Sequence, residues 1–331
     1  MKKQNLPAFA AGIGMLILIM DTKTAVSAVI EGLNLCLETL IPSLFPFIFL
    51  SSILSPSIIG KHIPGLTAIG RIMGIPAGCE SLFLIGLLGG YPVGAQCIAQ
   101  ASREGSISRE IGARMMAFCS NAGPSFLFGM GTRLFPDTWM CWALWVIHIA
   151  SAIAVSLIVP NQKVTPAKKV RASNAPIAIV LKKSIQTMAT VCGWVILFRV
   201  LLTFCQRWFL WLLPGHLTVL FTGILELANG CYDLKEIADI RLRFILFSGM
   251  LGFGGLCVAM QTFSVCDELD CRWYIPGKIL QSIISIILSY FLISREITVP
   301  FCIIVLAITV RMCMIHRRNR NNDSIPQKSD V

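Results

Sequence analysis

The sequence predicts an all-α polytopic membrane protein with about eight transmembrane helices and two re-entrant helical hairpins, arranged as two inverted repeats. The first observation behind this prediction is the composition: 55% of the 331 residues are hydrophobic and only 14% are charged. A soluble chain carries about a quarter charged residues and could not cover so much apolar surface. The second observation is that glycine and proline interrupt long apolar segments at similar places in both halves of the chain.

The net charge of +11 lies mainly in three basic clusters. Basic residues beside membrane spans are retained on the cytoplasmic side, so the three clusters and both termini are predicted to be cytoplasmic. No aromatic or glycine residues alternate with the basic ones, which argues against a nucleic-acid partner. The clusters are Lys2 and Lys3, then Lys163, Lys168, Lys169, Arg171, Lys182 and Lys183, and finally Arg317, Arg318 and Arg320.

The thirteen cysteines are scattered singly through apolar segments. Cys266 and Cys271 form the closest pair, but neither a second pair nor a set of histidines accompanies them. The cysteines therefore read as small buried hydrophobic residues, and no metal site or cofactor is predicted.

The first half begins with a transmembrane helix in residues 1–23 and continues with a repeat in residues 24–159. At the start of this repeat, Glu31 and Glu38 fall on the polar side of an apolar helical pattern, which is typical of a helix in the membrane interface. The predicted elements of the repeat are an interfacial helix at 24–38, a crossing at 39–58, a re-entrant hairpin at 83–101, a broken helix at 110–133 and a crossing at 137–159.

Helix breakers lie in the middle of two apolar runs of this repeat. The run 83–101 contains Gly-Gly-Tyr-Pro at 89–92, so it is predicted to fold as a hairpin that enters and leaves on one side. The run 110–133 is interrupted by Asn-Ala-Gly-Pro at 121–124. In lipid, unwound backbone survives only where protein or a hydrated pathway satisfies its N–H and C=O groups.

The same order of elements recurs after a basic cytoplasmic linker at 160–176. The second repeat, 177–296, is interrupted by Glu-Leu-Ala-Asn-Gly at 226–230 and by Gly-Phe-Gly-Gly at 252–255. Its predicted elements are an interfacial helix at 177–190, a crossing at 191–213, a re-entrant hairpin at 217–232, a broken helix at 241–263 and a crossing at 278–294. A last transmembrane helix at 297–315 and a basic cytoplasmic tail at 316–331 follow.

Counting crossings from a cytoplasmic N-terminus gives eight and returns the C-terminus to the cytoplasm. The first hairpin then enters from the cytoplasmic side and the second from the opposite side, so the two halves traverse the bilayer in opposite senses. The alternative is that the breakers are scattered by chance, because glycine and proline are common in membrane helices.

Corresponding interruptions in two repeats predict a binding site for a transported solute. Half-helix N-termini offer free N–H groups and a positive dipole end that bind carboxylates, and Tyr91 offers an aromatic face. The same glycines could instead only allow tight helix packing, and the amides could only bridge helices. The predicted substrate-binding residues are Gly89, Gly90, Tyr91, Pro92, Gly94, Gln96, Ser120, Asn121, Gly123, Pro124, Ser125, Asn229, Gly252, Gly254, Gly255 and Gln261.

Glu226 is the most informative single residue, because an ionised carboxylate in an apolar run usually marks an ion or proton pathway. It is predicted to couple solute movement to H⁺ or Na⁺; the alternative is that it reaches water or pairs with Arg199. His148 lies in a smooth crossing and is interpreted as a packed helix residue. Arg114 and Arg133 either mark helix ends or guide an anion toward the pathway.

The chain resembles the YlbJ-type sporulation integral membrane proteins in four strings of its first half: Gly-Gly-Tyr-Pro-Val-Gly-Ala at 89–95, Ile-Ser-Arg-Glu at 107–110, Phe-Cys-Ser-Asn-Ala-Gly-Pro-Ser-Phe at 118–126 and Pro-Ser-Leu-Phe-Pro at 42–46. That type is grouped with gate-domain proteins, which include spore maturation proteins, the ferrous-iron permease core and concentrative nucleoside transporters. The run 252–261 looks like the broken-helix segment of the nucleoside transporters. The resemblance implies a role in endospore formation and, for the YlbJ type, movement of dipicolinate toward the forespore.

These observations favour a secondary transporter of a small anionic solute that resembles dipicolinate, working by alternating access in the cell membrane or a membrane around the forespore. One alternative is a nucleoside-like or metal-ion permease, and another is a non-transporting scaffold needed for spore maturation or cortex formation. An enzyme is not predicted, because no His/Asp/Glu constellation has a workable spacing. The expected partners are the solute, the bilayer and a coupling H⁺ or Na⁺, and a homo-oligomer is compatible with the sequence.

Overall fold

The computed structural model describes residues 5–59, 61, 63, 65–160, 176–266 and 269–294. Within these ranges the chain is helical and contains no strand. Five helical runs of the described part are long and apolar enough to cross a membrane. The prediction of a helical membrane protein is therefore confirmed. Most of the predicted linker, the predicted last helix at 297–315 and the tail at 316–331 lie outside the described residues.

The first half of the chain forms a long helical run, a short helix, two pairs of short helices and one unbroken helix. Its elements are α1 (Asn5–Met20), α2 (Thr22–Leu35), a π-helical turn (Cys36–Leu40), α3 (Ile41–Ile58), α4 (Leu66–Met73), α5 (Ser81–Gly89), α6 (Val93–Arg103), α7 (Arg109–Cys119), α8 (Pro124–Leu134) and α9 (Thr138–Ile158).

The second half has a similar order: one long helix, two pairs of interrupted helices and one unbroken helix. Its elements are α10 (Ile177–Trp208), a 3₁₀ turn (Leu210–Leu212), α11 (Gly215–Leu225), α12 (Leu227–Asp233), a second 3₁₀ turn (Leu234–Glu236), α13 (Ile240–Phe253), α14 (Gly255–Val265) and α15 (Tyr274–Ile293).

Two predicted boundaries are absent from the structure. The predicted interfacial helix at 24–38 and the crossing at 39–58 belong to one helical run, Thr22–Ile58, and the corresponding segments 177–190 and 191–213 share α10. The π-helical turn Cys36–Leu40 comes just before Pro42, whose missing N–H would otherwise leave a gap in the α-helical ladder. The polar residues that suggested a boundary are thus on the exposed side of continuous helices.

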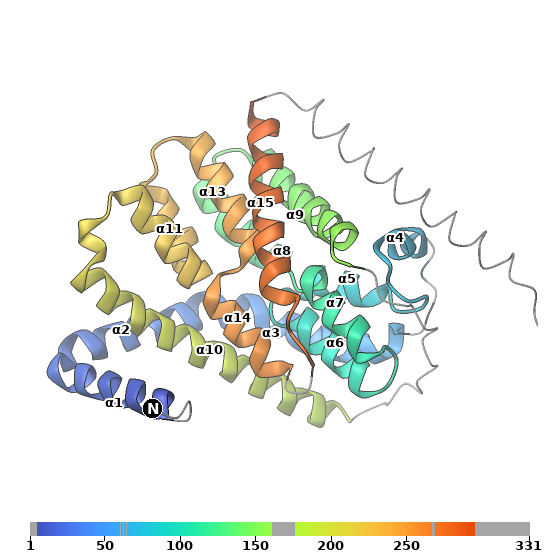
Figure 1. Cartoon of the computed structure of the whole chain (residues 1–331), viewed down its shortest axis with the longest axis horizontal. Helices are drawn as coiled ribbons and strands as arrows, with labels where there is room; N and C mark the ends of the chain where they lie inside the picture. Colours follow the sequence, from blue (N-terminus) through green and yellow to red (C-terminus); the bar gives the residue numbers. More distant parts are fainter. Residues whose placement is uncertain are drawn as a thin grey trace, which may run out of the picture.

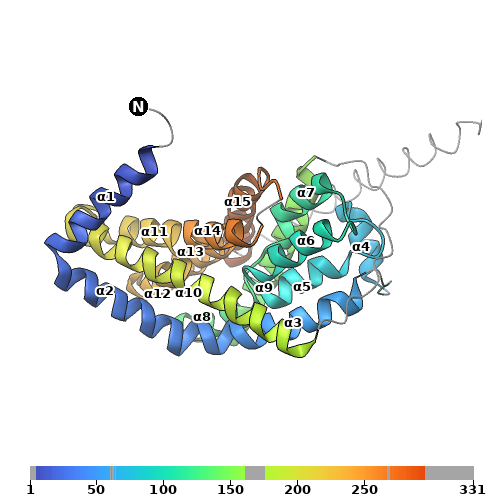
Figure 2. The ribbon, with the colours of Figure 1, turned by 90° about the horizontal axis from the view of Figure 1, so that it is seen from below.

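The two hairpins approach the middle of the molecule from opposite sides. Helices α5, α6 and α7 lie on one side and α11 on the other, and α15 passes between them beside α9 and α13 (Figure 1). Helix α12 packs against α11. The view from below shows α10 lying along α2 and α3 (Figure 2). The arrangement brings the interrupted helices of both halves to the middle of the molecule.

The breaks occur where the sequence contains residues that cannot continue a helix. Gly90, with a φ of +72°, ends α5, and Gly254, with a φ of +83°, separates α13 from α14. Pro124 is the first residue of α8, where its missing N–H costs nothing. The helices of the first hairpin have 9 and 11 residues, which corresponds to roughly 14 and 16 Å, or half of a hydrocarbon core of about 30 Å.

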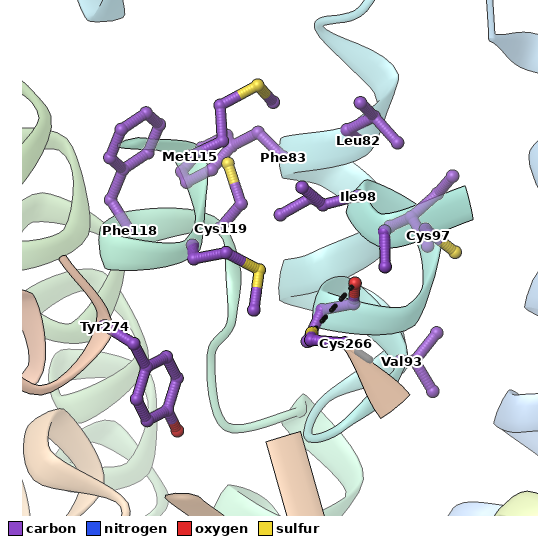
Figure 3. Packing of buried hydrophobic residues seen from close by; sticks show 14 of the residues in the cluster. Leu82, Phe83, Val93, Cys97, Ile98, Met115, Phe118, Cys119, Cys266 and Tyr274 are labelled. Carbon is purple, nitrogen blue, oxygen red and sulfur yellow. Dashed lines mark hydrogen bonds between the residues drawn. The ribbon is translucent and has the colours of Figure 1, made fainter. Parts of the chain in front are cut away.

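An apolar cluster joins the first hairpin to the second half of the chain. Figure 3 shows side chains of α5, α6 and α7 packed together with Cys266 and Tyr274, which flank the connection between α14 and α15. The Sγ of Cys266 lies 3.9 Å from the carbonyl oxygen of Ala95. This cluster fixes α7 against α15, and thereby places the break after α7 beside the first turns of α15. Its labelled members are Leu82, Phe83, Val93, Cys97, Ile98, Met115, Phe118, Cys119, Cys266 and Tyr274.

Candidate functional site

Residues from three helix breaks line one small cavity in the middle of the molecule. Tyr91 comes from the first hairpin, Gly123 from the α7–α8 break, Glu226 from the second hairpin and Gln261 from α14. The cavity has a volume of about 40 Å³, enough for one or two water molecules. The sequence predicted all four residues as site residues, and the structure brings them together.

Backbone contacts between glycines hold these breaks against one another. A Cβ atom on Gly90 would lie 2.9 Å from the backbone nitrogen of Gly123, and one on Gly254 would lie 3.1 Å from the Tyr91 ring. Both Gly90 and Gly254 also have positive φ angles, which other residues adopt only with strain. The first hairpin therefore touches both the α7–α8 break and the α13–α14 break.

The carboxylate of Glu226 is buried, with 2% of the residue exposed, and caps α12. Its oxygens accept hydrogen bonds from the backbone N–H groups of Ala228 at 3.1 Å and Asn229 at 2.6 Å, and from the Asn229 side chain at 2.6 Å. A carboxylate at a helix N-terminus is stabilised by these donors and by the helix dipole. The position of the Glu226 carboxylate is therefore fixed by the start of α12.

Arg199 reaches Glu226 only through Asn229. Its guanidinium donates to the Asn229 side-chain oxygen at 2.8 Å and pairs directly with Glu31, to which its Nε donates at 3.0 Å. The predicted alternative of a direct Arg199–Glu226 pair is thus replaced by a chain of contacts from partly exposed Glu31 to buried Glu226. Asn229, a predicted site residue, acts as the bridge.

A buried lysine, Lys278, lies behind Tyr91. It belongs to the first turn and a half of α15 and has none of its surface exposed. Its ammonium group donates to the carbonyl oxygen of Ser120 at the α7–α8 break, to the Gln281 side-chain oxygen at 2.6 Å and to the Tyr91 hydroxyl at 3.5 Å. All three acceptors are neutral groups.

The α7–α8 break is tied to α9 and α15 by further polar contacts. The Gln281 amide donates to the Asn121 side-chain oxygen at 2.9 Å, and the Asn121 amide donates to the Phe118 carbonyl at 2.8 Å. The backbone N–H of Ala122 donates to Nε2 of His148 at 3.1 Å. His148, interpreted from the sequence as a packed helix residue, thus satisfies one of the donors that the break leaves free.

Lys278 and Gln281 were missed by the sequence reasoning, which placed Lys278 at the end of a crossing. A signal was present: polar residues recur on one face of this apolar helix at spacings of three, seven and eleven residues. All members of this stripe are fully buried, whereas a polar stripe facing lipid would be too costly. The stripe consists of Lys278, Gln281, Ser285 and Ser289.

Several predicted site residues lie outside the cavity and serve packing. Gly94 allows the carbonyl of Cys119 to approach α6, and Gly252 allows α15 to approach at Ser282. Gln96 faces α10, where its amide donates to the Thr187 hydroxyl at 3.3 Å. Gly255 lies against the second hairpin. The other predicted residues are Gly89 beside Val93, Pro92 before α6, and Pro124 and half-buried Ser125 at the start of α8.

Arg114 is buried inside the protein. Its guanidinium donates to the carbonyl oxygens of Ser156 at 2.6 Å, Pro160 at 3.1 Å and Gly74 at 3.5 Å, and it lies over the Phe118 ring. It therefore joins the ends of three segments. Arg133, in contrast, is exposed at the end of α8.

The fold and this site define a class: a helical membrane protein in which interrupted helices meet at a buried polar cluster. Comparison with known proteins narrows the class. The chain is 26% identical over 303 residues to the "Sporulation integral membrane protein YlbJ" of Bacillus subtilis (strain 168), an alignment that covers 76% of this chain and 73% of the relative. The predicted resemblance to the YlbJ-type sporulation integral membrane proteins is thereby confirmed. No family model and no solved structure matched the chain.

Proposed function

We propose that the protein is a secondary transporter that moves a small anionic solute across a membrane during sporulation. The observation that carries this proposal is the cavity shared by Tyr91, Gly123, Glu226 and Gln261, because it joins breaks from both halves of the chain. Unwound backbone at mid-membrane is characteristic of solute sites in transporters built from repeats. The relative's printed name supports the link to sporulation.

A planar aromatic dicarboxylate such as dipicolinate suits the chemistry of this site. An aromatic residue, Tyr91, and an amide residue, Gln261, line the cavity, and the ammonium group of buried Lys278 lies 3.5 Å from the Tyr91 hydroxyl. Stacking on an aromatic ring and hydrogen bonds from neutral and cationic donors are the interactions that such a ligand requires. The resemblance to the YlbJ type independently suggests this solute.

The described conformation is closed around the site. A cavity of about 40 Å³ is far below the roughly 300 Å³ of sites for small organic ligands. Solute binding therefore requires the hairpins to move away from the breaks that they touch. The Tyr91 hydroxyl, which donates to the Leu251 carbonyl at 3.4 Å, is one contact that this movement breaks.

Glu226 is the proposed coupling residue. It lines the cavity and is buried, yet its position is held by the backbone of its own helix rather than by a direct cationic partner. Binding of H⁺ or Na⁺ at this carboxylate would remove or offset its repulsion of an anionic solute. Solute and ion would then be favoured in the same conformation, which is the basis of coupled transport.

We also propose eight crossings, cytoplasmic termini and an inverted relation between the two halves. Residues predicted to lie on one side of the membrane are close together: Arg103, Arg109 and Leu269 line one surface cavity. On the predicted opposite side, Arg243 donates to the carbonyl oxygen of Leu134 at 2.8 Å. The order of long helix, hairpin, broken helix and unbroken helix in each half agrees with such a repeat.

The direct test is uptake of radiolabelled dipicolinate into vesicles that contain the purified protein. Uptake above protein-free vesicles is expected, and Asn121→Ala should lower it because Gln281 loses its acceptor. Gln96→Ala is a matched control, since this amide lies outside the cavity. Uptake of a nucleoside or of ferrous iron without dipicolinate would contradict the anion assignment, and the absence of any uptake would contradict transport.

A further inference from the structure

The charge of Lys278 has no acidic partner among the described residues. Ion pairs of the described part include Arg199 with Glu31, Arg207 with Asp21, and Arg272 with Asp270. Lys278 is bound instead by a carbonyl, an amide oxygen and a hydroxyl. A cation buried at this depth is costly, and neutral acceptors offset that cost less than an anion does.

We propose that Lys278 is the anchor that binds a carboxylate of the transported solute. This inference rests on the proposed transport of an anion and assigns the positive end of that site to a residue of α15. Tyr91 connects Lys278 to the cavity: the residue lines the cavity, and its hydroxyl accepts a hydrogen bond from Lys278. Movement of Tyr91 with the first hairpin exposes the ammonium group to the space where the solute enters.

The surroundings of Lys278 are suited to exchanging partners. Two of its three acceptors, the Gln281 side chain and the Tyr91 hydroxyl, are side-chain groups that can be replaced by carboxylate oxygens. The Gln281 amide is oriented by Asn121, so its oxygen points to the lysine in the closed conformation. The Ser120 carbonyl, at the negative end of α7, supplies partial compensation while no anion is bound.

The comparison with Arg114 separates this role from a structural one. Arg114 is also buried, but it donates to three backbone carbonyls from separate segments, which a ligand could not replace without dismantling the fold. Lys278 has one backbone acceptor, Ser120, and lies beside the α7–α8 break. The two buried cations therefore differ in what surrounds them, and only Lys278 is adjacent to the cavity-lining Tyr91.

The experiment measures dipicolinate binding and uptake for wild type, Lys278→Met and Lys278→Arg, in purified protein and in vesicles. Loss of a charge-assisted hydrogen bond should weaken dipicolinate binding roughly tenfold to a hundredfold in Lys278→Met, with partial retention in Lys278→Arg. Lys235→Met is the matched control, because Lys235 is exposed, lies over the Tyr232 ring and does not line the cavity.

A role in charge recognition also changes selectivity, which a purely structural role would not. Wild type should prefer dipicolinate over its uncharged diamide, and Lys278→Met should lose most of that preference. Equal affinity and equal preference in folded Lys278→Met would overturn the inference while leaving the proposed transport intact. If the wild type itself moves no dipicolinate, the proposed function fails first, so the two failures are distinguishable.

A second measurement does not depend on the folding of a variant. Amine acylation of the wild-type protein in vesicles, followed by mass spectrometry, reports how often Lys278 becomes accessible. Saturating dipicolinate should slow acylation of Lys278 and leave that of Lys235 unchanged. Acylation of Lys278 that is insensitive to dipicolinate at concentrations that saturate uptake would contradict the assignment.

Discussion

The two halves of the molecule share an order of helices, but the charged groups at their breaks are satisfied by different kinds of contact. In the second half, the break at Glu226 contains a carboxylate that is satisfied by the N-terminus of its own helix, α12. In the first half, the break at 120–123 contains no charged residue, and the cation beside it, Lys278, comes from α15. One site is therefore locally compensated, whereas the other depends on contact between halves.

The two halves differ in the charges at their breaks, but the packing of their hairpins is similar. Gly86 and Gly94 let the arms of the first hairpin cross closely beside the Cys119 carbonyl, and Gly223 and Gly230 do the same in the second hairpin beside α13. The backbone scaffold is thus repeated, and the side chains at the breaks are what differ. This difference predicts that backbone substitutions damage both halves alike, while charge substitutions have distinct effects.

The largest expected effect is that of Gly90→Ala. The added Cβ would lie 2.9 Å from the Gly123 nitrogen, and the left-handed backbone alone costs about 1–3 kcal/mol for a residue other than glycine. Gly254→Ala, at the Tyr91 ring, should be similarly damaging. Melting temperature and yield of monodisperse protein in detergent report the loss.

Gly129→Ala is the control for these variants, because a Cβ there meets nothing within 4 Å. In a helix this change is expected to be neutral or stabilising by up to about 1 kcal/mol. If Gly90→Ala were as stable as Gly129→Ala, the close contact between the first hairpin and the α7–α8 break would be wrong.

Substitution of Glu226 should separate capping from coupling. Glu226→Ala leaves the N–H groups of Ala228 and Asn229 without their acceptor, at about 1–3 kcal/mol for each buried donor. Glu226→Gln keeps an acceptor but removes the charge, so stability should fall less, while uptake should no longer respond to an imposed H⁺ or Na⁺ gradient. Dipicolinate counterflow without a gradient should persist in this variant.

A Glu226→Gln variant that still accumulates solute in response to both gradients would remove Glu226 from the coupling step. Its role would then be that of a helix cap. The contrast between the two halves would remain, because the hydrogen bonds from the N-terminus of α12 to Glu226 do not depend on its role in transport.

The sequence predicted the positions of the breaks more successfully than their surroundings. Glycine and proline act through the backbone at their own position, so Gly90, Pro124 and Gly254 could be recognised without knowledge of contacts. Lys278 could not be recognised in this way, because its partners Ser120 and Tyr91 are 158 and 187 residues away. Only the polar spacing along α15 indicated that one face of this helix is buried against other polar groups.

The predicted interfacial helices show a second limit of the sequence, because polar residues there predicted helix boundaries that the structure does not contain. Glu31 and Glu38 suggested a boundary because they are polar, yet the helix continues through them to Ile58. Glu31 instead pairs with Arg199, a contact 168 residues away. A polar residue on a helix thus indicates which face is not apolar, but only the partner decides whether the helix ends.

Tyr91→Phe tests the contact between the halves with a smaller change. It removes the hydroxyl that accepts from Lys278 at 3.5 Å and donates to the Leu251 carbonyl at 3.4 Å, but keeps the ring. Both bonds are long, so the loss of stability should be about 1 kcal/mol. Because these bonds join the first hairpin to α13 and α15 in the closed conformation, the rate of dipicolinate uptake should rise by a few-fold. A slower rate with unchanged affinity would contradict this assignment of the hydroxyl to the closed state.

The smallest expected effect is that of Glu31→Gln. The Glu31–Arg199 pair is partly exposed, with 47% and 22% of the two side chains accessible, and such pairs contribute about 0–1 kcal/mol. Arg199 should remain in place, because its bond to the Asn229 side chain does not involve Glu31. Melting temperature and gradient-driven uptake should both stay close to wild type. A loss of gradient response in Glu31→Gln equal to that in Glu226→Gln would contradict this expectation. The charge of Glu226 would then depend on contacts beyond α12, as the charge of Lys278 depends on contacts beyond α15.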